Sequence, residues 1–289
     1  MNVFFVGSAG PLSVEPFQWL LSSEHVLCGV GLDWQEPANW PGQVGLTQLT
    51  LEHNTLASLA RAHQLSLVDL NNDDTSEVAA RIRALNPDLI LVSCYGRKVP
   101  DQILQVARHG GINCHPSLLP SYRGPAPLFW QYREGIDPLG VSLHVMNSEW
   151  DAGDVIASTT LEVVDGLPGA YIQLRLSEAL CDLLAQTLER FPDGLSPIAQ
   201  QQKDASYHGA PGPADFQVQT KWSARRIFNF MRATEHWGYA YPCEVNGRHY
   251  ELKHALVFSA DNQADLLPNN SEVLHFECNP GLMVASYYH

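Results

Sequence analysis

The sequence predicts an α/β fold, a doubly wound and mostly parallel sheet, followed by a smaller β-rich C-terminal domain that could close into an OB-like barrel. Short apolar runs alternate with stretches of helical period through the first half, which is the pattern of successive βαβ units. The run Leu89-Ile90-Leu91-Val92 is apolar on both faces, as in a parallel strand covered by helices on each side. Near the C-terminus, short strands are joined by turn signals such as Asn246-Gly247.

Each element of the first half is predicted from its own apolar pattern. Strands are expected at residues 3–6, 25–30, 65–70, 88–93 and 112–114, with helices between them at 12–22, 48–63, 76–85 and 101–108. Two further strands, at 140–146 and 155–163, precede a long helix at 169–190. That helix repeats leucines at helical spacing until Phe191-Pro192-Asp193-Gly194 ends it.

The character of the chain changes after this helix. A stretch rich in Gln, Ala, Gly and Pro follows, so we divide the chain into an N-terminal domain (1–196), a linker (197–205) and a C-terminal domain (206–289). Ser223 is placed to cap a helix that extends to Thr234. Hairpins are expected around Asn246-Gly247 and around Asn279-Pro280-Gly281.

Composition excludes several classes of protein. The 289 residues include 17 Lys plus Arg against 31 Asp plus Glu, a formal net charge of -14, which disfavours a general nucleic-acid binder and DNA in particular. No apolar run approaches the roughly 20 residues needed to cross a bilayer, and the N-terminus lacks the pattern of a signal peptide, so we expect a cytoplasmic protein with no membrane partner. The cysteines form no Cys-x-x-Cys pair and the histidines no zinc motif, so no metal is expected.

Three polar residues are predicted to meet at one edge of the sheet. Asn113 and His115 are two apart on a strand, so they point to the same side, and the carboxyl end of such a strand faces the ligand crevice. Asp151 lies on the loop between the two strands that follow. An amide, an imidazole and a carboxylate suit acyl transfer to an amine: Asn113 stabilises the oxyanion, His115 transfers a proton, and Asp151 supports the charged imidazole. Taken alone, an Asn-x-His pair at a strand end is more often part of a hydrogen-bonded turn.

The surrounding sequence changes that balance. The stretch Asn113-Cys114-His115-Pro116-Ser117-Leu118-Leu119-Pro120, the stretch Gly140-Val141-Ser142-Leu143-His144 and the stretch Asp151-Ala152-Gly153-Asp154-Val155 follow one another in order. Together they closely resemble the folate-dependent formyltransferases, which include enzymes acting on methionyl-tRNA, on glycinamide ribonucleotide and on amino sugars. The resemblance implies a Rossmann-like catalytic domain, 10-formyltetrahydrofolate as the formyl donor, and catalytic roles for Asn113, His115 and Asp151.

The same resemblance suggests binding residues. The stretch Ser93-Cys94-Tyr95-Gly96-Arg97-Lys98-Val99-Pro100 is similar to the family's segment that lines the pterin pocket. It implies cofactor contacts from Tyr95, Gly96, Val99, Gly153 and Asp154. Ser117 and Arg123 are expected to contact the substrate: Arg123 stands where the family has an Arg-Gly pair after the catalytic loop, which implies a supporting role near acceptor or folate, and a purely structural role for it is equally open.

The sequence departs from the tRNA enzymes at two places, and the first of them bears on the acceptor. Residues 33–48, where those enzymes carry a basic insertion, contain no Lys or Arg, and the chain ends at His289 where those enzymes continue. Without cations this loop cannot neutralise phosphates, although its tryptophans could stack on a base or sugar. Arg225 and Arg226 could touch an anionic acceptor, but a solvated helix face is the more common role for such a pair. We therefore expect a small-molecule amine, such as an amino-sugar nucleotide or an amino-acid derivative, as the acceptor.

Other functions remain open at this stage. Methionyl-tRNA formylation is the nearest alternative, motivated by the two-domain layout. Hydrolysis of 10-formyltetrahydrofolate would use the same residues, and it is disfavoured because no regulatory segment precedes the first strand at Asn2. A folate-sensing module with an inert site, or a nicotinamide oxidoreductase, is less well supported, since all three polar residues are retained and Gly7-Ser8-Ala9-Gly10-Pro11 lacks the G-x-G-x-x-G spacing. The sequence leaves the oligomeric state open.

Overall fold

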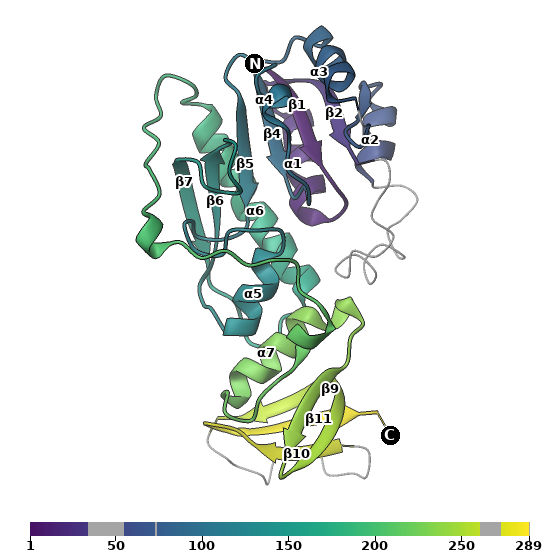
Figure 1. Cartoon of the computed structure of the whole chain (residues 1–289), viewed down its shortest axis with the longest axis vertical. Coiled ribbons are helices and arrows are strands. Elements are labelled where there is room, and N and C mark those ends of the chain that lie inside the picture. The colour runs from purple at the N-terminus through teal and green to yellow at the C-terminus, as the bar shows by residue number, and fades with distance from the viewer. Residues whose placement is uncertain (34–54, 73, 261–272, 289) are drawn as a thin grey trace.

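The computed structural model describes residues 1–33, 55–72, 74–260 and 273–288. Its larger part is a seven-stranded sheet with the strand order β3-β2-β1-β4-β5-β6-β7 (Figure 1). The strands are β1 (Asn2–Gly7), β2 (Val26–Leu32), β3 (Leu67–Asp69), β4 (Leu89–Ser93), β5 (Gly111–His115), β6 (Leu139–Val145) and β7 (Val155–Leu161). The first five run parallel, and β6 and β7 are antiparallel to their neighbours. The predicted doubly wound sheet is therefore confirmed.

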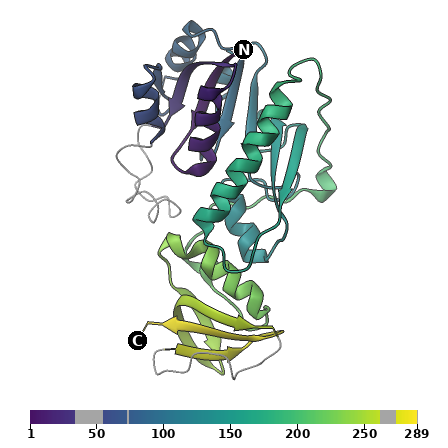
Figure 2. The same ribbon diagram turned by 180° about the vertical axis from the view of Figure 1, so that it is seen from behind.

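Helices cover both faces of this sheet, because successive side chains of β1 and β4 enter two separate cores. The helices are α1 (Pro11–Ser22), α2 (Leu56–Ala62), α3 (Thr75–Ala84), α4 (Asp101–Leu104), α5 (Pro127–Glu134) and α6 (Gly169–Leu188). Val3, Phe5 and Leu91 pack with residues of α1, α2 and α6, whereas Phe4, Val6 and Ile90 pack with residues of α3 and α4. Figure 2 shows α1 and α6 in front of the sheet when the molecule is seen from behind.

Three helices differ between the prediction and the structure. The helix expected at 101–108 was too long: α4 ends at Leu104, since the N–H groups of Arg108 and His109 bond to the carbonyls of Pro87 and Asp88 instead of continuing the helix. The helix α5 was missed, although Pro127 stands at its start and Gly135 adopts the left-handed conformation at its end. Of the helix expected at 48–63, residues 48–54 lie outside the described part, and α2 begins at Leu56 because Thr55 is extended and caps it.

The smaller part is a four-stranded antiparallel sheet with the order β10-β11-β9-β8. Its strands are β8 (Tyr241–Val245), β9 (Arg248–Ser259), β10 (Val273–Glu277) and β11 (Leu282–Tyr287), so both expected hairpins are confirmed. Over the described residues β8 and β10 are opposite edges, and the sheet is open rather than closed into a barrel. The helix α7 (Ala224–Thr234) packs on it, and the Ser223 hydroxyl caps that helix by accepting from the Arg226 N–H at 3.2 Å.

The two sheets are joined by packing between α5 and α7 (Figure 1). The ring of Phe129 on α5 lies 5.0 Å from that of Phe216 and 5.6 Å from that of Phe230, centroid to centroid. On the surface beside them, Arg225 pairs with Asp165 at 2.7 Å and with Asp137 at 3.3 Å. The guanidinium of Arg225 is therefore paired with carboxylates of the protein itself. The division of the chain into domains at 1–196 and 206–289, with a linker between them, stays a prediction. No helix in the described ranges is both long and apolar enough to cross a bilayer.

Candidate active site

The predicted polar residues lie in one cavity of about 870 Å³ at the carboxyl ends of β1, β4 and β5. This is the point where the strand order reverses between β1 and β4, the usual ligand position in a doubly wound sheet. Asn113, His115 and Asp151 all line it, and so does His144 on β6. The cavity is therefore lined by the three residues that the sequence predicts to be catalytic and by His144, for which the sequence predicted no role.

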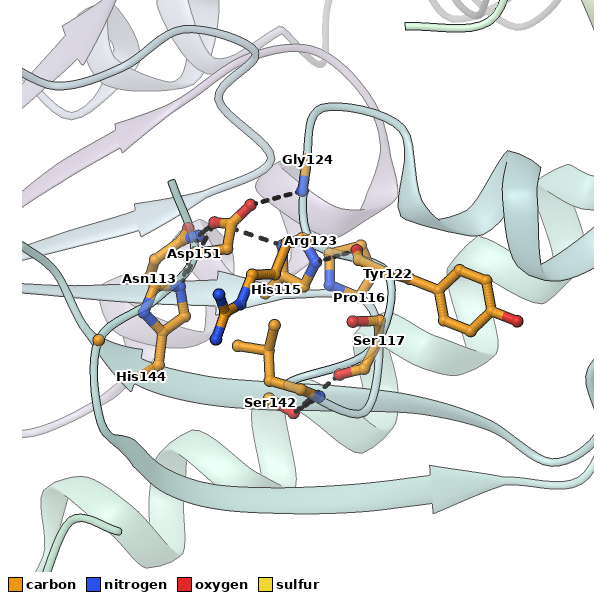
Figure 3. A network of polar contacts seen from close by, with 12 residues as sticks. Asn113, His115, Pro116, Ser117, Tyr122, Arg123, Gly124, Ser142, His144 and Asp151 are labelled. Carbon is orange, nitrogen blue, oxygen red and sulfur yellow. Dashed lines mark hydrogen bonds and ion pairs between the residues drawn. The ribbon is translucent and has the colours of Figure 1, made fainter. Parts of the chain in front are cut away.

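The centre of the site is a hydrogen-bonded network around Asp151 (Figure 3). The Asn113 amide Nδ2 donates to Asp151 Oδ1 at 3.1 Å, and the Nδ1 atom of His115 lies 3.6 Å from the same oxygen. The other oxygen, Oδ2, accepts from the backbone N–H of Gly124 at 2.9 Å. The carboxylate of Asp151 therefore connects its own loop to strand β5 and to the loop at Gly124.

Asp151 is held as an anion. Burial alone would raise the pKa of this carboxyl, but the imidazole of His115 and the N–H of Gly124 outweigh burial and lower the pKa to about 2. The side chain is only 8% exposed, so these partners replace water almost completely. At neutral pH the site contains a fixed negative charge beside an imidazole.

The hydrogen bonds of His115 define which ring nitrogen is available. Its Nε2 atom lies 2.8 Å from the carbonyl oxygen of Tyr122, and because a carbonyl can only accept, Nε2 carries the hydrogen. Burial lowers the pKa of His115, although Asp151 acts in the opposite direction. The neutral ring then presents an unprotonated Nδ1, and a proton taken there would lie next to the Asp151 carboxylate.

His144 belongs to the same network, although the sequence analysis assigned it no role. Its Nδ1 donates to the carbonyl of Val145 at 2.9 Å, so its Nε2 accepts from the Asn113 amide at 3.1 Å. Both hydrogens of that amide are thus bound within the network, and donation to a substrate oxygen requires one bond to be exchanged. The available sequence signal was that His144 ends one of the stretches resembling the family, whereas its place opposite Asn113 comes from the strand register.

The structure places the other predicted residues in two groups. Tyr95, Gly96 and Val99 line the cavity, and their contact with a cofactor stays a prediction. Gly153 and Asp154 lie behind Asp151: the carbonyl of Asp154 accepts from the Val145 N–H at 2.9 Å, and a Cβ on Gly153 would come within 1.8 Å of the Val145 carbonyl oxygen. Their described contacts support the loop rather than line the cavity, and cofactor contact by these two stays a prediction.

Ser117 and Arg123 do not line the cavity, so the expected substrate contact is not seen for either. Ser117 is fully buried, and its hydroxyl donates to the Ser121 carbonyl at 2.7 Å, which closes the turn after β5. Arg123 is 7% exposed, and its guanidinium points away from the cavity toward the side chains of Gln200 and Gln202. Both residues shape the loop that presents His115 and Gly124.

Three loops around the site carry residues with left-handed backbone. The φ angle is 56° at Cys94, 59° at Tyr122 and 48° at Asp151, and none of the three is glycine. Such residues are uncommon and gather at functional sites, where the surrounding contacts hold them. In the described part of the chain, no cluster of three or more His, Cys, Asp or Glu side chains is arranged to hold a metal ion.

The fold and the site define a doubly wound α/β protein with a large cavity at the switch point of its sheet and a buried imidazole and carboxylate in the cavity wall. The chain belongs to the formyl transferase family, because the family model described as "Formyl transferase" matches residues 41–188. A methionyl-tRNA formyltransferase of Ehrlichia ruminantium is 28% identical over 280 residues, which is 96% of this chain and 88% of that protein. The family uses 10-formyltetrahydrofolate as its formyl donor.

Two solved structures share the fold. An N-formyltransferase from Helicobacter canadensis, in complex with folinic acid and dTDP-3-aminofucose, matches with a TM-score of 0.70 at 14% identity and covers all of both chains. A variant of HypX from Aquifex aeolicus matches with a TM-score of 0.63 at 20% identity over 99% of this chain. This chain spans 43% of that HypX chain. The likeness confirms an α/β sheet followed by a smaller antiparallel sheet.

Proposed function

We propose that this enzyme transfers a formyl group from 10-formyltetrahydrofolate to the primary amine of a small molecule, such as an amino-sugar nucleotide or an amino-acid derivative. The observation that carries the proposal is the buried network of Asn113, His115 and Asp151 at the wall of one large cavity. Its groups supply what attack on a formyl carbon requires: a hydrogen-bond donor for the oxyanion, a base for the amine proton, and an anion that stabilises the charged base.

The proton path follows from the free nitrogen of His115. The acceptor amine attacks the formyl carbon, the C=O electrons move to oxygen, and the Asn113 amide donates to that oxygen after releasing one of its present partners. His115 Nδ1 takes the proton of the amine, and the imidazolium is stabilised by Asp151 Oδ1, which lies 3.6 Å away. The bond to N10 of the folate then breaks as His115 returns the proton to that nitrogen. The products are the N-formyl amine and tetrahydrofolate.

The described lining of the cavity has few positive charges, which favours a small acceptor over a polyanion such as tRNA. His236 and Trp237, from the short helix η3 (Glu235–Trp237) that follows α7, line the cavity together with Phe129, Gln173 and Glu15. Burial lowers the pKa of His236, so this wall is uncharged except for Glu15. The cations of the described lining are Arg97, which pairs with Asp33 at 2.6 Å, and Lys98. The loop in which the sequence has no cation, residues 33–48, lies outside the described part except for Asp33.

Methionyl-tRNA formylation is the second candidate. It is favoured by the Ehrlichia ruminantium relative, which carries that name and aligns with 96% of this chain. Charge argues against it, since tRNA binding depends on neutralising several phosphates and the chain has a formal net charge of -14.

The test is tetrahydrofolate release from 10-formyltetrahydrofolate under three conditions: no acceptor, a pool of amino-sugar nucleotides and amino-acid amines, and charged initiator tRNA at low salt. Release that depends on the small-molecule pool supports the proposal. Release only with tRNA selects the second candidate, and equal release without any acceptor would show hydrolysis instead of transfer. Asn113→Ala serves as the control, because it must abolish whichever release is enzymatic.

A further inference from the structure

The segment between the two sheets is hydrogen-bonded to the strand that follows the Asp151 loop and to the loop that contains Arg123 and Gly124. We call residues 198–208 the bridging segment. Near its start, Ile198 exchanges backbone hydrogen bonds with Val155 at 2.8 and 2.9 Å, just after the loop that carries Asp151. Near its end, the Arg123 N–H donates to the Ser206 carbonyl and the His208 N–H donates to the Arg123 carbonyl, both at 2.9 Å. A region expected to be a linker is thus part of the framework of the site.

Within the bridging segment, the side chain of Gln200 contacts both loops at once. Its Nε2 donates to the carbonyl oxygens of Asp151 at 2.8 Å and Gly153 at 2.6 Å. Its Oε1 accepts from Arg123, from Nε at 3.1 Å and from Nη2 at 2.7 Å. A primary amide has two donor hydrogens and two acceptor lone pairs, so every polar group of this side chain is used.

These contacts form a closed ring with the catalytic carboxylate. Arg123 directly precedes Gly124, whose N–H donates to Asp151 Oδ2 at 2.9 Å, and Asp151 returns to Gln200 through its own carbonyl. The carbonyl of Tyr122, on the other side of Arg123, accepts from His115. A shift of Gln200 would therefore move both partners of the Gly124–Asp151 hydrogen bond and the support of the imidazole.

The chemistry of an amide suits this position. Arg123 is buried, and a buried guanidinium needs acceptors. A carboxylate in place of Gln200 would satisfy it, but it could not donate to the carbonyls of Asp151 and Gly153 and would add a second negative charge beside the catalytic one. The neutral oxygens of Gln200 and Gln202 bind Arg123 while leaving Asp151 as the carboxylate that faces His115.

We propose that Gln200 is a positioning residue for formyl transfer, which fixes Asp151 against Gly124 and His115 by clasping the Asp151 backbone to Arg123. The inference rests on the proposed function for its kinetic consequence, whereas the clasp itself is a property of the folded chain. It also implies that the placement of the bridging segment sets the geometry of the catalytic carboxylate.

Two variants and a matched control test this role. Gln200→Leu removes all four hydrogen bonds, and Gln200→Glu keeps the oxygen that faces Arg123 but loses both donations to the Asp151 loop. Gln201→Leu alters the neighbouring exposed side chain and is the control. We expect kcat to fall between roughly 10-fold and 100-fold in both Gln200 variants, since small displacements of catalytic groups have effects of this size. The KM for 10-formyltetrahydrofolate should stay within about twofold, and the control should match the wild type.

A second measurement does not depend on turnover. Amide hydrogen exchange at Gly124 reports its bond to Asp151, and we expect its protection to fall about tenfold or more in both Gln200 variants while core amides of β4 keep theirs. Wild-type protection at Gly124 in Gln200→Leu, or a wild-type kcat in either Gln200 variant, would overturn the proposal. An equal loss of protection throughout the sheet would assign Gln200 a general structural role and would overturn it as well. A wild-type enzyme that transfers formyl to no amine would instead refute the proposed function, and the exchange result would still decide the clasp.

Discussion

The two sheets of the molecule treat buried polar groups in opposite ways. Around the carboxyl ends of the seven-stranded sheet, His115, Ser117, Arg123, His144 and Asp151 are all less than 9% exposed and hydrogen-bonded to one another or to neighbouring loops. In the described part of the four-stranded region, the core is apolar apart from Thr234, which bonds to Phe230 and Tyr241. Burial of polar groups costs stability unless each is satisfied, so their concentration in one region marks where the chemistry takes place.

The largest expected effect comes from removing the shared carboxylate charge. Asp151→Asn should lower kcat by about 10²-fold to 10⁴-fold, because His115 loses the anion that stabilises its protonated form. Steady-state kinetics of tetrahydrofolate release measures this. Asp193→Asn removes an exposed carboxylate from the turn after α6, away from the network, and should retain most of the activity. Similar losses in both variants would mean that the loss does not come from the network around Asp151.

The four-stranded region should respond with stability rather than with turnover. Phe230 is fully buried against Phe129, Phe216, Trp222 and Tyr241. Phe230→Ala should therefore lower the free energy of unfolding by about 3–5 kcal/mol, measured by urea denaturation. Leu256→Ala, at a position 44% exposed, should change it by no more than about 0.5 kcal/mol. A Phe230→Ala enzyme that is as stable as the wild type would contradict the view that α5 and α7 share one apolar core around Phe230.

The same contrast predicts how stability depends on pH. The folded-state pKa of Asp151 is lowered to about 2, so its contribution of about 2 kcal/mol is complete above the ordinary pKa and is lost as pH falls toward 2. The pKa of His115 is also lowered, so protonation below its ordinary range destabilises the folded state too. Urea midpoints at pH 7, 5 and 3 should fall more steeply for the wild type than for Asp151→Asn. Parallel curves would show that the network does not control the acid response.

The smallest effect should be the contribution of the four-stranded region to substrate binding. Trp237→Ala removes an indole from the cavity wall and should raise the acceptor KM by roughly tenfold, about 1.4 kcal/mol, while the donor KM is unchanged. Tyr95→Ala, on the side assigned to the pterin, should do the reverse. The same change in both constants for either variant would remove the division of the cavity into donor and acceptor sides.

The sequence was informative where the signal was local. The buried run of β4, the pair Asn113 and His115 on β5, and the Asn246-Gly247 hairpin each depend on neighbours in the chain, and all were predicted correctly as elements. Asp151 lies 38 residues from Asn113, yet the order of the strands already suggested that the two meet, and the family resemblance strengthened that prediction. His144 was quoted for the resemblance but not assigned a role, because its partner is set by the register between β5 and β6.

Long-range contacts explain what was missed elsewhere. Gln200 lies in a polar stretch with the composition of a linker, yet its amide binds a loop 49 residues away. His236 and Trp237 reach the cavity only because α7 packs on α5 and α6. Arg123 resembled a substrate-binding residue, and only its burial against Gln200 places it outside the cavity. No spacing within the chain reports contacts of this kind.

The most direct test follows the formyl carbon itself. With ¹³C-labelled 10-formyltetrahydrofolate and the amine pool, NMR should find the label in an N-formyl product for the wild type and for Asp193→Asn, and almost none over the same time for Asp151→Asn. Label that reaches the product equally fast in Asp151→Asn, or that appears only as formate in the wild type, would contradict formyl transfer by the Asn113, His115 and Asp151 network.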